Sequence, residues 1–248
     1  MKAKTVTAAR QAQPPIAWLV GLLILGVFAF VAGQSQAHAG SYVVDFTDYH
    51  SALGSVDAWL QSKGFQFERD AKSQDKILLS ADGRGLEVEA LQQAQGLLIN
   101  HAIAPNAFSA VEIEWGVQHH PQGASYENKV NNEAIMVHVF FGNEKKPSGG
   151  MFAPDLPYFV GLFLCSGGDR VGYAYTGRYY QAGGRYVCLQ SAPAGQTFVS
   201  RFDIRDGVRS IFGNIAQAVS GYSIEVDTSA SSGAGKSSAF IKRIRFLS

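Results

Sequence analysis

The sequence lacks a concentrated block of charge of either sign. Its 248 residues include 21 lysine and arginine residues and 20 aspartate and glutamate residues, and these are dispersed along the chain. A protein that binds nucleic acid needs a concentrated basic face to neutralise phosphates. The composition therefore argues against a nucleic-acid partner, and it points to no other charged partner.

The long apolar run of the sequence is confined to residues 16–32. It follows Lys2, Lys4 and Arg10 and precedes Ala37-His38-Ala39, and this order of basic, apolar and small residues is typical of an export signal. We predict a signal peptide over residues 1–39 and a mature protein that is periplasmic or secreted in a bacterial envelope. An uncleaved N-terminal anchor is the alternative, because the run approaches the roughly 20 residues that span a bilayer.

Cysteine is scarce, with only Cys165 and Cys188. Both lie in apolar, strand-like runs of the part that we expect to be exported. Two thiols in an oxidising compartment most simply form one disulfide. No histidine lies near either residue in the sequence, so a catalytic cysteine is not indicated.

Apolar residues recur with a period of two, which is typical of half-buried strands. Glycine is abundant, with 27 residues, and Asp82-Gly83-Arg84-Gly85 predicts a hairpin turn. We predict an all-β fold over residues 40–248, as one antiparallel, jelly-roll-like β-sandwich. The alternating residues that carry this prediction are Phe65 and Phe67; Val111, Ile113 and Trp115; Ile135, Val137, Val139 and Phe141; and Phe240, Ile244 and Phe246.

One or two short helices are expected beside the strands. Residues 49–62 place apolar side chains at helical spacing after Asp48, a residue type that caps helix N-termini. Residues 203–212 form the second such segment, and Gly213 follows it as a C-cap.

The second half of the chain resembles a known family. The resemblance covers about residues 105–246, and the family is an exported bacterial domain of unknown function, the one numbered 3047. It implies a β-sandwich of the cell envelope and no particular reaction. The motifs that carry it are Asn132-Glu133 before residues 135–141, Arg201 and Asp206 before residues 211–213, and residues 224–227 before a Gly/Ser loop and residues 241–246.

Glu112 and Glu114 are the candidate catalytic residues if the protein is an enzyme. They alternate along one predicted strand, so their carboxylates share a face and lie roughly 6 to 7 Å apart. This separation falls between those of retaining and inverting glycosidases, which makes a polysaccharide hydrolase or lyase one hypothesis. The other interpretation is that both acids face solvent, opposite the apolar core residues of the same strand.

No metal or cofactor is predicted. A metal site would have to use His119 or His120 with Glu133 or Asp155, but adjacent histidines on an extended segment point to opposite sides. No further ligand spacing supports such a site.

Tyrosine is concentrated in residues 173–186, between glycines and arginines. Its flat rings with hydroxyl groups suit sugars, although cross-strand aromatic pairs also stabilise sheets without a ligand. We therefore favour a non-catalytic envelope protein that binds a glycan or a protein partner, with a purely structural or assembly protein as the remaining alternative. The predicted ligand-binding residues are Tyr173, Tyr175, Arg178, Tyr179 and Tyr180.

Overall fold

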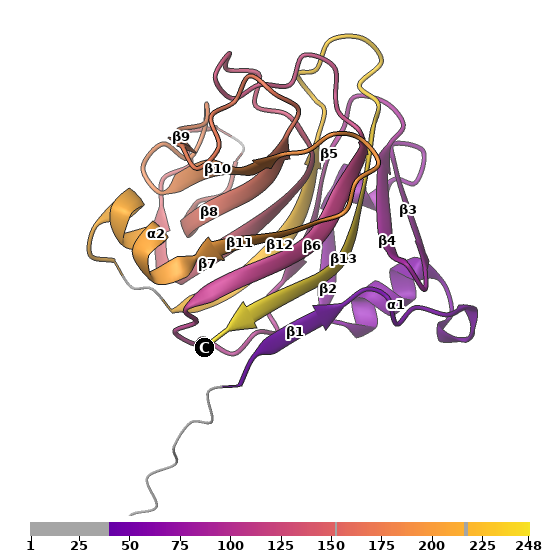
Figure 1. Cartoon of the computed structure of the whole chain (residues 1–248), viewed down its shortest axis with the longest axis horizontal. Coiled ribbons are helices and arrows are strands. Elements are labelled where there is room, and N and C mark those ends of the chain that lie inside the picture. The colour runs from indigo at the N-terminus through magenta and orange to yellow at the C-terminus, as the bar shows by residue number, and fades with distance from the viewer. Residues whose placement is uncertain (1–39, 152, 216–217) are drawn as a thin grey trace, which may run out of the picture. The chain divides into compact units, whose positions relative to one another are not determined.

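The computed structural model describes residues 40–151, 153–215 and 218–248, and these contain two β-sheets (Figure 1). The predicted signal peptide, residues 1–39, lies outside the described residues, so it stays a prediction. Within the described ranges, no helix is long and apolar enough to cross a membrane.

The first sheet has six strands, and all of its pairs are antiparallel. The long strand β13 pairs with β6 along one edge, and along its other edge it pairs first with β4 and then with β1. The order is β11 (Phe198–Asp203), β6 (Ala110–His119), β13 (Ser237–Leu247), β4 (Gly85–Ala90) and β3 (Ile77–Asp82), with β1 (Tyr42–Asp45) beside β13.

The second sheet has seven strands, and one of its pairs is parallel. This pair departs from the predicted antiparallel arrangement. The chain leaves β8, forms the edge strand β9, and returns between the two as β10, antiparallel to β9 and parallel to β8. The order is β2 (Phe65–Arg69), β5 (Gln95–Asn100), β12 (Val219–Asp227), β7 (Glu133–Lys146), β8 (Leu156–Cys165), β10 (Gly184–Ser191) and β9 (Ala174–Tyr175).

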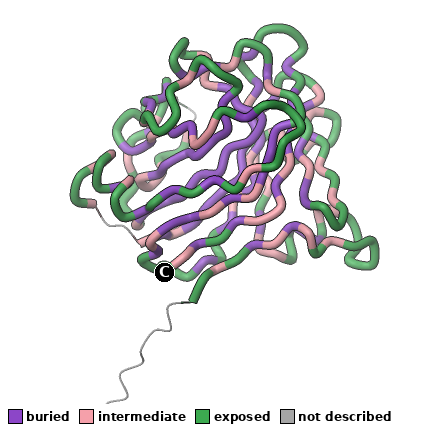
Figure 2. The backbone as a smooth tube through the Cα atoms, in the orientation of Figure 1, coloured by how far each residue is buried: buried purple, intermediate pink, exposed green. Residues whose placement is uncertain are grey.

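The main core lies between the two sheets. Trp115 on β6 is fully buried, and its indole Nε1 donates a hydrogen bond of 3.0 Å to Ser200 Oγ. Across the core, Tyr222 of β12 packs on Phe246 of β13 with ring centroids 5.6 Å apart. The all-β, jelly-roll-like sandwich predicted from the period-two pattern is therefore confirmed. Figure 2 shows that buried residues follow the strands of both sheets.

The outer face of the seven-stranded sheet is covered as well, which the sequence analysis did not anticipate. Val137 and Leu162 point into the main core, so their neighbours Met136 and Phe163 point to the opposite face. There they belong to a second, smaller core, which we call the outer core. Its buried members are Tyr126, Met136, Phe163, Cys165, Tyr175 and Cys188.

The two predicted helices are both present, but the first starts later than expected. Helix α1 (Val56–Ser62) has Ser55 as its N-cap, whose hydroxyl accepts a hydrogen bond from the Ala58 amide. Asp48 is not the cap of this helix. It is followed by a short 3-10 turn (Ser51–Leu53), and Gly54, with φ 88°, separates this turn from α1. Helix α2 (Ile204–Phe212) ends at Gly213, as predicted, and the Asp203 side chain caps its start.

The predicted hairpin at residues 82–85 is confirmed, since β3 and β4 pair from Asp82 and Gly85 outward. The side chain of Asp82 accepts a hydrogen bond of 2.8 Å from the Arg84 amide. This local contact fixes the turn and the register of the two strands.

Candidate functional site

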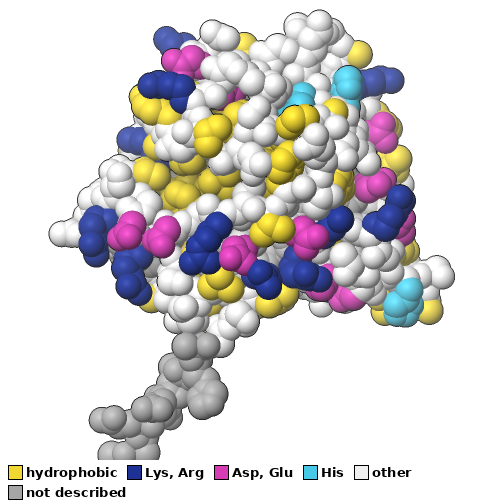
Figure 3. Space-filling model, viewed as in Figure 1, with side chains coloured by type: hydrophobic (Ala, Val, Ile, Leu, Met, Phe, Trp, Pro, Cys, Tyr) yellow, Lys and Arg dark blue, Asp and Glu magenta, His cyan; other side chains and the backbone are white. Residues whose placement is uncertain are grey.

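Glu112 and Glu114 lie on the outer face of the six-stranded sheet. Arg201 Nη1 donates to Glu112 Oε1 at 3.0 Å, and Arg245 donates to the other oxygen of this carboxylate. Arg243 Nη1 lies 3.5 Å from Glu114 Oε2. In the space-filling view, basic and acidic side chains alternate in a band across this face (Figure 3).

The ion pairs of Glu112 decide its protonation state. Hydrogen bonds from Arg245 and Arg201 lower the pKa of Glu112 below its ordinary value, so this carboxyl is ionised at neutral pH. The pair lines a shallow depression together with Val199, Arg243 and Arg245. The geometry is that of a charged, solvated sheet face, on which Glu112 cannot serve as the protonated acid of a glycoside cleavage.

The residues proposed for a metal site make other contacts. His120 Nε2 lies 2.8 Å from the Ala192 carbonyl oxygen, His119 is exposed, and Asp155 accepts a hydrogen bond from the Ser148 amide. Glu133 is buried on β7 and accepts a hydrogen bond from Tyr126. Nowhere in the described part of the chain do three or more His, Cys, Asp or Glu side chains form a group that could hold a metal ion.

Two of the predicted ligand-binding tyrosines are exposed near the short edge strand β9. Tyr173 and Tyr179 each expose 45% of their surface. The Arg170 guanidinium lies 3.6 Å from the centroid of the Tyr173 ring, and that of Arg178 lies 5.5 Å from the centroid of Tyr179. We call these four side chains the tyrosine-arginine surface.

The backbone beneath Tyr179 is glycine for a steric reason. A Cβ atom at Gly150 would lie 3.2 Å from the Tyr179 ring, so the ring rests against bare backbone there. Next to it, Met151 exposes 90% of its surface. The ring is thereby supported from one side and presents amphipathic surface to solvent.

Tyr175 and Tyr180 lie differently from the sequence-based expectation of a ligand-contacting surface. Tyr175 is only 6% exposed, because its ring belongs to the outer core. Its hydroxyl donates to Glu127 Oε2 at 2.9 Å and accepts from the Arg170 amide at 2.7 Å. Tyr180 is half-buried with φ 58°, a strained value for a bulky residue, and packs on Phe159 with centroids 5.4 Å apart.

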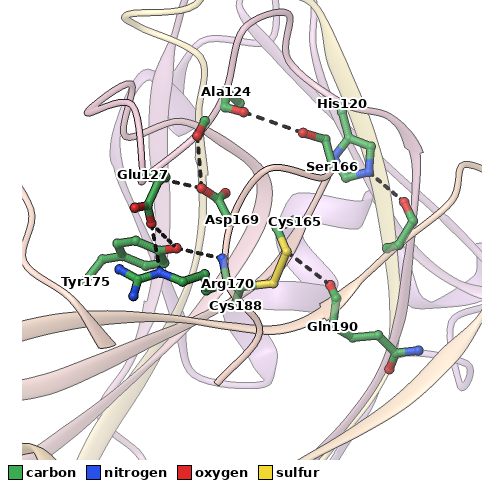
Figure 4. Close-up of a disulfide and its surroundings, with 12 residues drawn as sticks. His120, Ala124, Glu127, Cys165, Ser166, Asp169, Arg170, Tyr175, Cys188 and Gln190 are labelled. Atoms are coloured by element: carbon green, nitrogen blue, oxygen red, sulfur yellow. Dashed lines mark hydrogen bonds and ion pairs between the residues drawn. A yellow bond between two sulfur atoms is a disulfide. The ribbon is translucent and has the colours of Figure 1, made fainter. Parts of the chain in front are cut away.

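The loops that carry this surface are tied to one another and to the sheet (Figure 4). The predicted disulfide between Cys165 and Cys188 is present and joins β8 to β10. Asp169 Oδ1 accepts hydrogen bonds from the Ser125 hydroxyl and the Glu127 amide, both at 3.0 Å. Residues 166–175 are therefore held in place by the disulfide on one side and by segment 121–131 on the other.

A cluster of carboxyl groups lies on the outer face of the seven-stranded sheet, and the sequence analysis did not identify it as one site. Glu133 on β7 stands opposite Asp227 on β12, and Glu225 precedes Asp227 by two residues on the same face. Glu133 is 2% exposed and Glu225 is 7% exposed. We call these three side chains the carboxyl cluster.

Glu225 has polar contacts with both neighbouring strands. The Gln95 side-chain amide on β5 donates to Glu225 Oε1 at 2.8 Å, and His138 Nε2 on β7 lies 3.3 Å from Glu225 Oε2. His138 Nδ1 in turn lies 3.0 Å from the Ser223 hydroxyl. These are the residue types of a nucleophilic triad, but Ser223 is completely buried, so a substrate has no access to its hydroxyl.

Burial shifts the ionisation of these groups strongly. It raises the pKa of Glu225 to about 7 and, together with the charge of Glu225, that of Asp227 to about 7. Burial and the two neighbouring acids raise the pKa of Glu133 well above its ordinary value. Burial lowers the pKa of His138 to about 3, so this imidazole is neutral. The cluster therefore holds protons close to neutral pH.

Part of this cluster was visible in the sequence. Asn132-Glu133 and residues 224–227 are among the motifs of the family resemblance, and the structure brings them together, because Asn132 Nδ2 donates to Asp227 Oδ1 at 3.0 Å. A further signal was the apolar run of residues 135–141, since a strand with apolar residues on both faces is covered on both sides.

Comparisons with known protein families and with curated proteins find no match. Among solved structures, the chain is similar to a "xylan-binding module CBM15" with 9% identity and a TM-score of 0.31, over 84% of this chain and 98% of that one. It is also similar to the Trichoderma harzianum endoglucanase 3 from family GH12, with 9% identity and a TM-score of 0.34, over 74% of this chain and 98% of that one. Similarity this weak carries no argument about function.

Proposed function

We propose that this protein is an exported, non-catalytic β-sandwich that binds a glycan through the tyrosine-arginine surface. The observation that carries the proposal is the exposure of two tyrosine rings, 45% each, beside arginine side chains on supported loops. Sugar rings have apolar faces bordered by hydroxyl groups, and aromatic rings with nearby hydrogen-bond donors match both features.

Binding fits the arrangement of acids better than hydrolysis does. Glu112 and Glu114 are both ion-paired with arginines on an open sheet face, and the pKa of Glu112 is lowered, so Glu112 is not available as a proton donor. The acids whose pKa values burial raises, Glu133 and Glu225, are 2% and 7% exposed and so are not open to a substrate. A glycosidase needs an acid and a second carboxylate that both reach the substrate.

The disulfide and the predicted signal peptide together support the export part of this proposal. A structural disulfide persists in oxidising compartments such as the periplasm or the extracellular space. The resemblance to the family numbered 3047 supports the same placement in a bacterial envelope.

Two variants of Tyr179 test the binding surface. Tyr179→Ala removes the exposed ring, whereas Tyr179→Phe keeps the ring and removes only the hydroxyl. Calorimetric titration with soluble oligosaccharides from envelope and plant cell-wall polysaccharides should show binding for the wild type and the Phe variant. The Ala variant should bind about tenfold more weakly or worse, since aromatic contacts contribute on the order of 1 kcal/mol or more.

Unchanged affinity in Tyr179→Ala and in Tyr173→Ala would contradict the proposed surface. Absence of binding by the wild type to any oligosaccharide, together with a stable complex with an envelope protein, would favour the protein-partner alternative instead.

A further inference from the structure

Segment 121–131 lies over the carboxyl cluster. The hydroxyl of Tyr126 donates to Glu133 Oε2 at 2.7 Å, and its ring packs on Phe163 and Tyr186 with centroids 4.5 and 5.1 Å apart. Tyr126 is 5% exposed. Tyr126 is thus the side chain of the segment that contacts the cluster, while Glu127 ties the segment to Tyr175 on β9, and Asp169 accepts hydrogen bonds from the Ser125 hydroxyl and the Glu127 amide.

The cluster has an excess of acidic groups over bases. Glu225 on β12 faces Glu133 and His138 on β7, Asp227 on its own strand, Tyr126 on segment 121–131, and Tyr180 and Tyr186 from the far edge of the sheet. The charge of Asp155 also acts on Tyr180. In the described part of the chain, Arg69 on β2 is the cation that acts on Glu225 and Asp227. Full ionisation of the three acids would leave uncompensated negative charge in a buried place.

Segment 121–131 covers this face without being a strand of the sheet. Strands β7 and β12 are paired on both edges and also pack in the main core. The segment is bridged internally between Ser125 and Val130, in both directions at 2.9 Å, and its Gln122 carbonyl accepts a hydrogen bond of 3.1 Å from the Ser232 amide. Lys129 within it has φ 63°, a strained value. A local change would therefore open this segment before it disrupts either strand.

We propose that the carboxyl cluster is a proton-operated latch, which holds segment 121–131 on the outer face of the seven-stranded sheet and releases it when the acids ionise. Release lets water reach Glu133, Glu225 and Asp227. It also breaks the contact of Glu127 with Arg170, whose Nε donates to Glu127 Oε2 at 3.1 Å, and so loosens the support of Tyr173. The latch is a property of the protein alone and does not depend on glycan binding.

The direction follows from the ionisation of the cluster. The closed state holds protons on carboxyl groups whose pKa values burial raises, whereas in the open state those groups approach the ordinary carboxyl range. Closure is therefore most favourable below about pH 4.5, and it weakens as the pH rises from there through about 7.

Amide hydrogen exchange at pH 5 to 8, corrected for the intrinsic pH dependence of exchange, measures this opening. We expect protection of the Ser125 and Val130 amides to fall with rising pH, by up to about tenfold per pH unit for each proton released. The bridge between Ser125 and Val130 is too short to be stable once the segment has left the sheet, so their amides should exchange in the open state. Amides in the middle of β6, such as Ile113, exchange through global unfolding, so at each pH their protection should exceed that of the Ser125 and Val130 amides.

Two variants and one wild-type measurement complete the test. Glu225→Gln keeps the shape of the side chain and cannot ionise, so protection of segment 121–131 should depend less on pH. Glu89→Gln, at an exposed position on β4, is the matched control and should behave as the wild type.

If Glu225→Gln does not fold, carbon-13 NMR of the wild-type carboxyl groups decides. Midpoints near neutrality support the latch, and midpoints between 4 and 5 for all glutamates, or pH-independent protection of segment 121–131, would overturn it.

Discussion

Among individual side chains, Glu225 couples the stability of the whole protein to pH. Its pKa is raised by burial from the ordinary value of 4.5 to about 7 in the folded protein. The folded state thus binds more protons than the unfolded chain between these two values, and stability falls as the pH rises through them.

We therefore predict that the free energy of unfolding is higher at pH 5 than at pH 8. The shift of the Glu225 pKa from 4.5 to about 7 corresponds to a difference of roughly 3 kcal/mol in the free energy of unfolding between pH values well below and well above this range. The raised pKa values of Asp227 and Glu133 act in the same direction. Urea denaturation at a series of pH values measures this difference. Stability that increases from pH 5 to pH 8 would show that the cluster is not protonated in the folded protein.

The pKa values of Glu112 on the first sheet and Glu225 on the second are shifted in opposite directions, because the two side chains have different neighbours. Glu112 is bonded by two arginines and has a lowered pKa, whereas Glu225 is buried beside a neutral histidine and an amide. Strand alternation predicted only that Glu112 lies opposite a core face. It could not predict what covers that face, because the covering segments come from distant parts of the chain.

Among the secondary-structure elements, β8 and β10 are linked both by backbone pairing and by a disulfide. They form the parallel pair of the second sheet, and the disulfide between Cys165 and Cys188 joins them on its outer face. The chain between the two cysteines contains β9 and both exposed tyrosines of the proposed binding surface.

Removal of this disulfide should weaken the sandwich and loosen the binding surface. For the sequence separation of 23 residues, we expect a loss of about 3 kcal/mol in the free energy of unfolding. The Cys165→Ala/Cys188→Ala double variant can be compared with the wild type by urea denaturation. Equal stability of the two proteins would mean that the strands and the outer core alone order this region.

The sequence predicted the elements more successfully than their arrangement. Period-two runs located β2, β6, β7 and β13, and the turn at Gly83 gave the β3–β4 hairpin, because both signals are local. The start of α1 was misplaced, since Ser55 competes successfully with Asp48 for the cap. The parallel pair, the outer core and the meeting of Glu133 with Asp227 depend on strand order, which a single sequence does not determine.

For the protein as a whole, the outer faces of the two sheets differ in what covers them and in the side chains that they expose. The six-stranded sheet exposes an alternating band of ion pairs, which keeps it solvated (Figure 3). The seven-stranded sheet is covered by loops that bury the carboxyl cluster and present Tyr173 and Tyr179 at its β9 edge. The proposed glycan-binding surface and the carboxyl cluster therefore lie on the same side of the sandwich.

The most direct test of glycan binding is the thermal unfolding of the protein alone and with increasing concentrations of soluble oligosaccharides at pH 5. A ligand that binds only the folded state raises the unfolding temperature in proportion to the logarithm of its concentration above Kd. We predict such a rise for at least one oligosaccharide, and its loss in Tyr179→Ala. An unfolding temperature that stays constant for every oligosaccharide up to tens of millimolar would contradict the proposal.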